Sequence, residues 1–110
     1  MASFAFHFSY HPETWARLVA EPADRTPAVR QTVEEAGGTL TGLYYTLDDL
    51  GGLALVEAPD ADTAAAISLV IIASGAFASV RIQRLWPAGD VTPILDAAQA
   101  AAATFRRPGG

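Results

Sequence analysis

One histidine stands where a side chain could exchange a proton with a ligand. His7 lies in the stretch from Ser3 to Tyr10, in which large aromatic side chains alternate with smaller ones. This period of two predicts a strand that buries its aromatic face and carries His7 on the opposite face. Because histidine is the side chain best suited to moving a proton near neutral pH, His7 is a candidate for binding or catalysis.

A second predicted strand, from Ala76 to Trp86, supplies polar partners for this histidine. Its residues Arg81 and Gln83 alternate with apolar ones, so they share one face. If the two strands are neighbours, that face also carries His7 and Ser9. An imidazole, a guanidinium and an amide around a small cavity suit an anionic or carbonyl-bearing ligand. The alternative is that His7 is only hydrogen-bonded within a subunit interface.

Two tyrosines and a glutamate complete the candidate set. Tyr44 and Tyr45 are adjacent in a predicted strand from Thr39 to Leu47, so one packs in the core and the other could present its hydroxyl to the cavity. Both could equally be ordinary strand-forming aromatics. Glu57 ends an apolar run, where a partly buried carboxylate could act as a base and a solvated strand end is the alternative. The catalytic candidates are therefore His7 and Glu57, and the ligand-binding candidates are His7, Ser9, Tyr44, Tyr45, Arg81 and Gln83.

Several kinds of chemistry are not expected. The chain has no cysteine and two histidines, so neither a metal site nor another cofactor is predicted. Asp48 and Asp49 are adjacent carboxylates, but two ligands in a short turn are too few to hold a cation. All seven basic residues are arginine, which excludes a Schiff base on lysine.

The charge and hydropathy of the chain limit the classes of partner that we expect. The net charge is −5 and the arginines are scattered, which argues against binding to nucleic acid. The longest apolar run, Leu69 to Ala73, is far shorter than the roughly 20 residues that span a bilayer, so no membrane partner is expected. The first residues do not resemble a signal peptide. The absence of cysteine fits a cytoplasmic protein.

The order of the predicted elements indicates the fold. Strands are expected at Ser3–Tyr10, Thr39–Leu47, Leu53–Glu57 and Ala76–Trp86. Helices are expected after Pro12, over Thr26–Ala36 with Thr26 as N-cap, over Ala61–Ser74, and after Thr92. This order predicts an α+β, ferredoxin-like split βαβ fold, an antiparallel sheet with helices on one face and an added C-terminal helix. The first strand would lie between the third and the fourth, within one domain over residues 1–107 followed by a frayed tail at 108–110.

The predicted helix from Ala61 to Ser74 is apolar on more than one side. Ile67, Val70 and Ile71 form a stripe toward the core, whereas Leu69 and Ile72 point elsewhere. Either the last helix or a second subunit must cover these outer residues. The sheet also has an uncovered face, and large apolar surfaces usually mark interfaces. We therefore expect a homodimer of the dimeric α/β barrel type, or a higher homo-oligomer.

Part of the sequence resembles the GYD-domain family. The resemblance covers Ser9 to Asp60 most clearly and is carried by Ser9-Tyr10-His11-Pro12-Glu13-Thr14-Trp15, Gly37-Gly38, Gly42-Leu43-Tyr44-Tyr45 and Val56-Glu57-Ala58-Pro59-Asp60. It implies a ferredoxin-like domain that often assembles through its sheet, without an assigned activity. The Gly-x-Tyr-Asp sequence typical of the family's hairpin is replaced here by Asp48, Asp49, Leu50 and Gly51.

Two classes of function follow. The first is a small-molecule-binding protein with a pocket on the uncovered sheet face, holding a small apolar or anionic ligand between His7, Arg81, Gln83 and one tyrosine. A cofactor-independent enzyme acting in the same pocket is a version of this class. The alternative is a non-enzymatic self-assembly or protein-interaction module.

Overall fold

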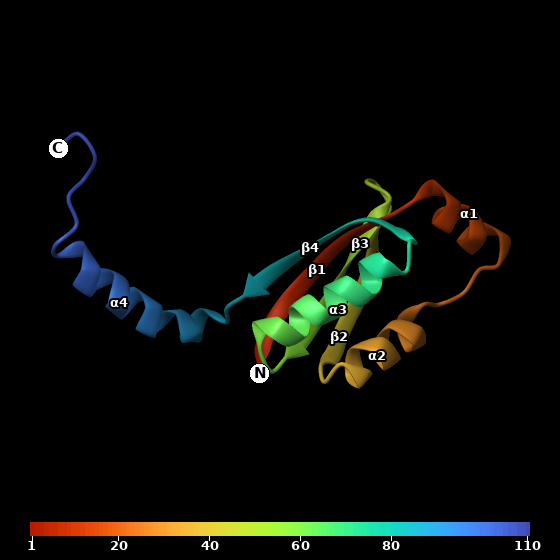
Figure 1. The fold of residues 1–110 in the computed structure, drawn as a ribbon, viewed down its shortest axis with the longest axis horizontal. Helices are drawn as coiled ribbons and strands as arrows, with labels where there is room; N and C mark the ends of the chain where they lie inside the picture. Colours follow the sequence, from red (N-terminus) through yellow and green to blue (C-terminus); the bar gives the residue numbers. More distant parts are fainter.

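A computed structural model describes all 110 residues and contains one four-stranded antiparallel sheet with strand order β2-β3-β1-β4. The strands are β1 (Ala2–Tyr10), β2 (Thr39–Thr46), β3 (Gly51–Ala58) and β4 (Phe77–Leu85). The helices are α1 (Pro12–Ala20), α2 (Thr26–Glu35), α3 (Ala61–Ala73) and α4 (Thr92–Ala102), with a short 3-10 helix, η1 (Ala88–Val91), before α4 (Figure 1). The structure confirms the α+β, ferredoxin-like prediction, including the position of β1 between β3 and β4.

Local sequence signals set most helix ends. The Asp60 carboxylate accepts a hydrogen bond of 2.8 Å from the backbone N–H of Thr63, which caps α3 as expected and lowers the pKa of Asp60. Gly37 ends the α2 segment with a φ of 98°, a backbone conformation that favours glycine. The prediction of Thr26 as N-cap is wrong. Thr26 is already helical, and its backbone N–H donates instead to the Asp24 carboxylate at 2.9 Å.

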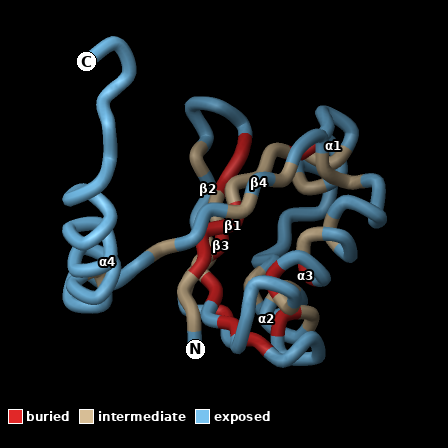
Figure 2. The backbone as a smooth tube through the Cα atoms, turned by 60° about the vertical axis from the view of Figure 1, so that its left-hand side comes forward, coloured by how far each residue is buried: buried red, intermediate tan, exposed pale blue.

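The core lies between the sheet and helices α2 and α3. Phe4 and Phe6 of β1 face these helices and pack with Val33 of α2 and Ile67 of α3, all almost fully buried. Figure 2 shows the buried residues gathered in the middle of the sheet and on the inner sides of the two helices. The alternation predicted for β1 is therefore the pattern that builds the core.

Helix α3 turns fewer apolar residues inward than its sequence suggests. Ile67 is buried and Ile71 is half-buried, but Val70, predicted to face the core, is 57% exposed. Leu69 and Ile72 are also exposed, as expected for residues on another side of the helix. The prediction for Val70 fails because α2 and α3 do not close over this part of the sheet.

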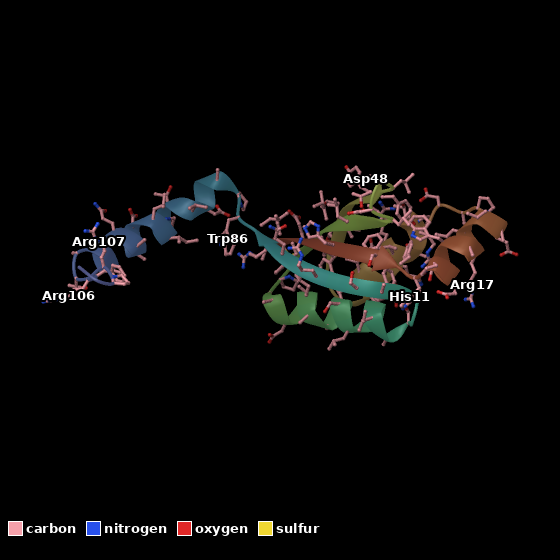
Figure 3. All side chains as sticks on the ribbon, turned by 90° about the horizontal axis from the view of Figure 1, so that it is seen from above. His11, Arg17, Asp48, Trp86, Arg106 and Arg107 are labelled. Carbon is pink, nitrogen blue, oxygen red and sulfur yellow. The ribbon has the colours of Figure 1, made fainter.

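Helix α4 projects away from the rest of the molecule. It continues from the end of β4 through η1, which is the element it contacts, and Arg106 and Arg107 lie at its far end (Figures 1 and 3). The molecule consequently measures 60 × 33 × 22 Å. Of the two covers considered for the outer side of α3, the last helix of the same chain is thus excluded. None of the helices combines the length and the apolar character needed to cross a membrane.

Two helical valines provide a matched test of the core. Val33 of α2 is 2% exposed and Val19 of α1 is 79% exposed. Val33→Ala should lower the free energy of unfolding by about 2 kcal/mol, because it removes two buried methyl groups and leaves a cavity. Val19→Ala should change it by less than about 0.5 kcal/mol. Urea unfolding followed by circular dichroism measures both, and equal effects would contradict this description of the core.

Candidate functional site

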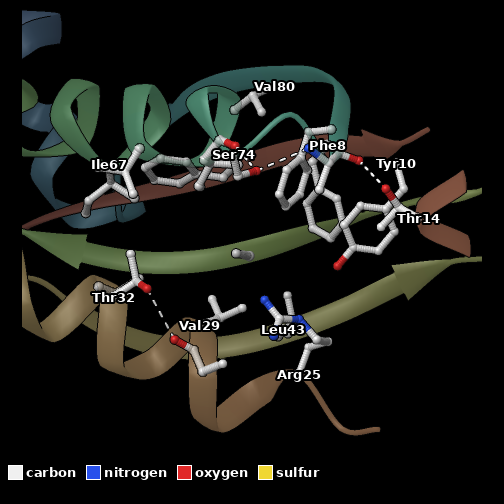
Figure 4. A pocket seen from close by; sticks show the side chains of 18 of the residues that line it. Phe8, Tyr10, Thr14, Arg25, Val29, Thr32, Leu43, Ile67, Ser74 and Val80 are labelled. Atoms are coloured by element: carbon white, nitrogen blue, oxygen red, sulfur yellow. Dashed lines mark hydrogen bonds between the residues drawn. The ribbon is translucent and has the colours of Figure 1, made fainter. Parts of the chain in front are cut away.

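The helix-covered face of the sheet contains a cavity of about 440 Å³. Fifteen of its twenty lining residues are hydrophobic, so its walls are mainly apolar. Phe6, Phe8 and Tyr10 of β1 form its floor, with α3 on one side and α2 on the other (Figure 4). This size lies within the range of small-molecule sites in proteins.

The cavity follows from the lengths of the elements around it. The nine residues of β1 extend over about 30 Å, whereas the ten residues of α2 extend over about 15 Å. Helix α2 packs mainly over β2 and α3 mainly over β4, so the central strands lie beneath the space between the helices. The small side chain of Ala54 on β3 leaves this space unfilled.

Polar groups in the cavity are few, and most are already paired. Three lining hydroxyls donate to backbone carbonyl oxygens: Thr14 to Ala76 at 2.7 Å, Ser74 to Ile71 at 2.6 Å, and Thr32 to Ala28 at 3.3 Å. The charged lining residues are Arg17 and Arg25, and no aspartate or glutamate lines the cavity. Its charged groups are therefore exclusively cationic.

An aromatic cluster closes one end of the cavity. It consists of Phe8, Tyr10, Trp15, Tyr45 and Phe77, whose contacting rings have centroids 4.9 to 6.2 Å apart. The Tyr10 and Tyr45 hydroxyls are 3.2 Å apart, and the Trp15 indole N–H donates to the Leu50 carbonyl at 2.8 Å. Burial, and then the hydrogen bond with Tyr45, raise the pKa of Tyr10 far above its usual value. The phenol of Tyr10 is thus a neutral group over the physiological range.

The uncovered face of the sheet brings together most of the polar residues singled out in the sequence. His7 Nε2 is 2.9 Å from Gln83 Oε1, and Arg81 lies directly opposite His7 in the β1–β4 register. Ser9 is hydrogen-bonded to Ser79 at 2.7 Å. His7, Ser9 and Arg81 line a hollow of about 270 Å³ on this face, and most of its lining residues are polar or glycine. A ligand site here stays a prediction.

The other candidates, Tyr44, Tyr45 and Glu57, do not line this hollow. Tyr45 lies on the helix-covered face in the aromatic cluster, whereas Tyr44 lies on the uncovered face opposite Leu53. The two tyrosines therefore cannot line the same pocket. Glu57 is exposed and pairs with Ser3, whereas His7 pairs with Leu53, so about 13 Å of strand separates Glu57 from His7. These two catalytic candidates do not act on one small ligand together.

Asp49 stabilises the turn of the hairpin through its carboxylate. The Asp49 carboxylate accepts hydrogen bonds from the Thr46 hydroxyl and from the backbone N–H of Gly51. Nowhere in the chain do three or more histidine, aspartate or glutamate side chains gather as a metal-binding group. The carboxylate pair at Asp48 and Asp49 thus belongs to the turn.

Sequence reasoning missed the cavity on the helix-covered face. The signals were the small residues Gly52 and Ala54 on a central strand, opposite Phe8 and Phe6 in the register. A Cβ atom at Gly52 would lie 2.6 Å from the Phe8 ring, so glycine lets that ring reach its place in the aromatic cluster. Arg25 was not singled out because it precedes a helix, where an arginine is ordinarily a surface residue.

A match to a family model shows the family of the chain. The GYD domain model matches residues 4–95, which include β2, β3, β4 and most of β1, and the chain belongs to the GYD domain family. No curated protein matches the sequence.

The raised pKa of Tyr10 gives a pH-dependent prediction. In the unfolded chain tyrosine titrates near pH ~10, and the folded state holds this proton more tightly. The stabilisation is therefore complete below about pH 10 and is lost as the pH rises toward the folded pKa. From pH 9 to 11 the free energy of unfolding should fall by up to about 1 kcal/mol more in the parent protein than in Tyr10→Phe. Urea unfolding at each pH measures this difference, and parallel curves would contradict the assignment.

Proposed function

We propose that this GYD-domain protein binds a small molecule in the cavity between the sheet and helices α2 and α3. The observation that carries the proposal is an apolar cavity of about 440 Å³ beside an otherwise packed core. The cavity is partly open to solvent, so it is a concave site at the surface and a ligand could enter it. Concave sites with mainly apolar walls and a few polar groups are where proteins ordinarily bind small molecules.

The lining favours binding over catalysis. Acid–base chemistry needs a group that titrates near neutral pH, and no histidine, aspartate or glutamate lines this cavity. The Ser74 hydroxyl donates to the Ile71 carbonyl, and no base lies beside it to activate it as a nucleophile. A cofactor-independent enzyme would instead use His7 on the uncovered sheet face, where a second, more polar hollow supports it.

A neutral apolar fluorophore tests the proposal. Phenylnaphthylamine should bind the parent protein with a rise in fluorescence. Leu43→Trp, which fills the cavity from β2, should weaken binding about tenfold or more, since it removes most of the space for the rings. Leu47→Trp is the matched control, because Leu47 is 65% exposed and does not line the cavity. Circular dichroism would verify that both variants fold.

Two results would contradict the cavity as the site. One is the absence of probe binding to the parent protein, and the other is unchanged affinity in Leu43→Trp. His7→Ala distinguishes the two faces of the sheet, since it should leave the affinity for phenylnaphthylamine unchanged. A loss of binding in His7→Ala alone would move the site to the polar hollow on the uncovered face.

Self-association is the second function we propose, and the size of the exposed surface supports it. The chain exposes 7507 Å², about 1,700 Å² more than the roughly 5,800 Å² expected for a compact monomer of its mass. Its radius of gyration is 18.0 Å, against about 13 Å for a compact chain of this length. A standard interface buries about 800 Å² on each partner. The excess exposed area is thus larger than the area that one subunit buries in a standard interface.

Helix α4 is the part of the chain that most needs a partner. Isolated helices shorter than about 12 residues are marginal in water, and α4 has 11 residues. Ile94 and Leu95 of α4 are exposed, as is Phe105 just beyond it. We therefore propose that α4 packs against a second copy of the chain, which would stabilise the helix and cover these side chains.

Light scattering after gel filtration tests this assembly. The parent protein should elute as a dimer or larger homo-oligomer, and Leu95→Glu should shift it toward the monomer because it places a charge in the interface. Ala100→Glu adds the same charge on the other side of the helix, more than about 100° from both Leu95 and Ile94, and should have the smaller effect. A parent protein that is monomeric at tens of micromolar would contradict the proposal.

A further inference from the structure

We infer that the cavity takes an amphipathic organic anion, with an aromatic or aliphatic body between the helices and a carboxylate, or a similar acidic head group, held by Arg25. This inference rests on the proposed function of the same cavity and adds the chemical class of its ligand. It follows from the charge of the lining, from its uncommitted donors, and from the apolar character of its walls.

The charge of the lining is opposite to that of the protein. The chain carries 12 acidic and 7 basic residues, yet the cavity is lined by two arginines and by no acidic residue. Cationic ligands are disfavoured there by like-charge repulsion. A guanidinium presents several N–H donors in a planar fork that matches a carboxylate, so an anion is the complementary ligand.

The position of Arg25 suits the binding of a head group. It immediately precedes α2, and its side chain lies among the lining residues, on the α2 side of the cavity (Figure 4). The Tyr10 hydroxyl is also close, since Arg25 partly offsets the rise that burial causes in the pKa of that phenol. Arg25 is exposed, so a ligand acid at this point would meet a positive charge at the solvent edge of an apolar space.

The remaining hydrogen-bond donors converge on the same place. The hydroxyls of Thr14, Thr32 and Ser74 are used by backbone carbonyls. Either hydroxyl of the Tyr10–Tyr45 pair can be the donor, and only Tyr10 lines the cavity. When Tyr45 donates to Tyr10, the Tyr10 hydrogen is free for a ligand, and Arg25 and Tyr10 together then offer donors to the two oxygens of a carboxylate.

The walls exclude strongly polar anions. A nucleotide or an inorganic phosphate would leave most of its oxygens against Phe8, Val29 and Ile71, where no donor is available. Burying unpaired polar groups is costly. A ligand with an apolar body and one acidic group matches both the apolar walls of the cavity and the positive charge of Arg25.

Two fluorophores with the same rings test the inference. Anilinonaphthalene sulfonate carries one negative charge, and phenylnaphthylamine is its neutral analogue. The parent protein should bind the sulfonate about tenfold or more tightly than the neutral probe, since charged hydrogen bonds contribute most when they are partly buried. Raising the salt concentration should weaken binding of the sulfonate only.

Substitution of the arginine should remove this preference. In Arg25→Gln the affinity for the sulfonate should fall about 10- to 100-fold, and the affinity for the neutral probe should stay within about twofold. Arg30→Gln on the same helix is the matched control, because Arg30 does not line the cavity, and it should affect neither probe. Arg25→Lys retains the charge and should keep part of the preference for the sulfonate.

The outcomes distinguish the preference for an anion from ligand binding in the cavity as such. If the neutral probe binds and the parent protein does not prefer the sulfonate, the anion inference is overturned and the proposed cavity stands. If neither probe binds, both the anion inference and the proposed function of the cavity are overturned. If Arg25→Gln binds neither probe, the salt dependence in the parent protein decides, and a salt-independent affinity for the sulfonate overturns the inference.

Discussion

The difference in rise between a helix and a strand governs the architecture of this small domain. A helix advances 1.5 Å per residue and a strand about 3.4 Å, so a ten-residue helix covers only about half the length of a nine-residue strand. Helix α2 is of this length, and its Val33 covers the part of the sheet around Leu40 and Val56. Aromatic side chains, together with α1, close the remaining end, and the cavity lies between these two regions.

Much of the fold could be predicted because it depends on local periodicity. The alternation of aromatic residues in β1 gave the buried face, and the parity of β4 placed Arg81 and Gln83 beside His7. These predictions need only the regular geometry of a strand. The cap at Asp60 was predictable for the same reason, since a side chain at this position bonds within its own first turn.

What could not be predicted depends on the separation of elements in space. Val70 has the helical spacing of a core residue but lies beside the cavity, because the gap between α2 and α3 is a property of the assembled layers. The opposite orientation of Tyr44 and Tyr45 was predictable, but the strand register decides which of them is covered. Arg25 belongs to the candidate site only through the chain path between α1 and α2. The arrangement of the elements in space thus differs from the prediction more for the candidate site residues than for the fold.

The hairpin between β2 and β3 has consequences for how the domain can vary. This chain lacks the Gly-x-Tyr-Asp sequence there, yet the turn is held by Asp49 and its partners, and the Leu50 carbonyl accepts the Trp15 indole. A carbonyl oxygen is present whatever residue occupies that position. Leu50 has a φ of 58°, however, a left-handed backbone conformation that glycine and asparagine adopt readily and that β-branched residues and proline do not. The tip of this loop can therefore vary without releasing the helix that closes the domain only where the new residue tolerates that conformation.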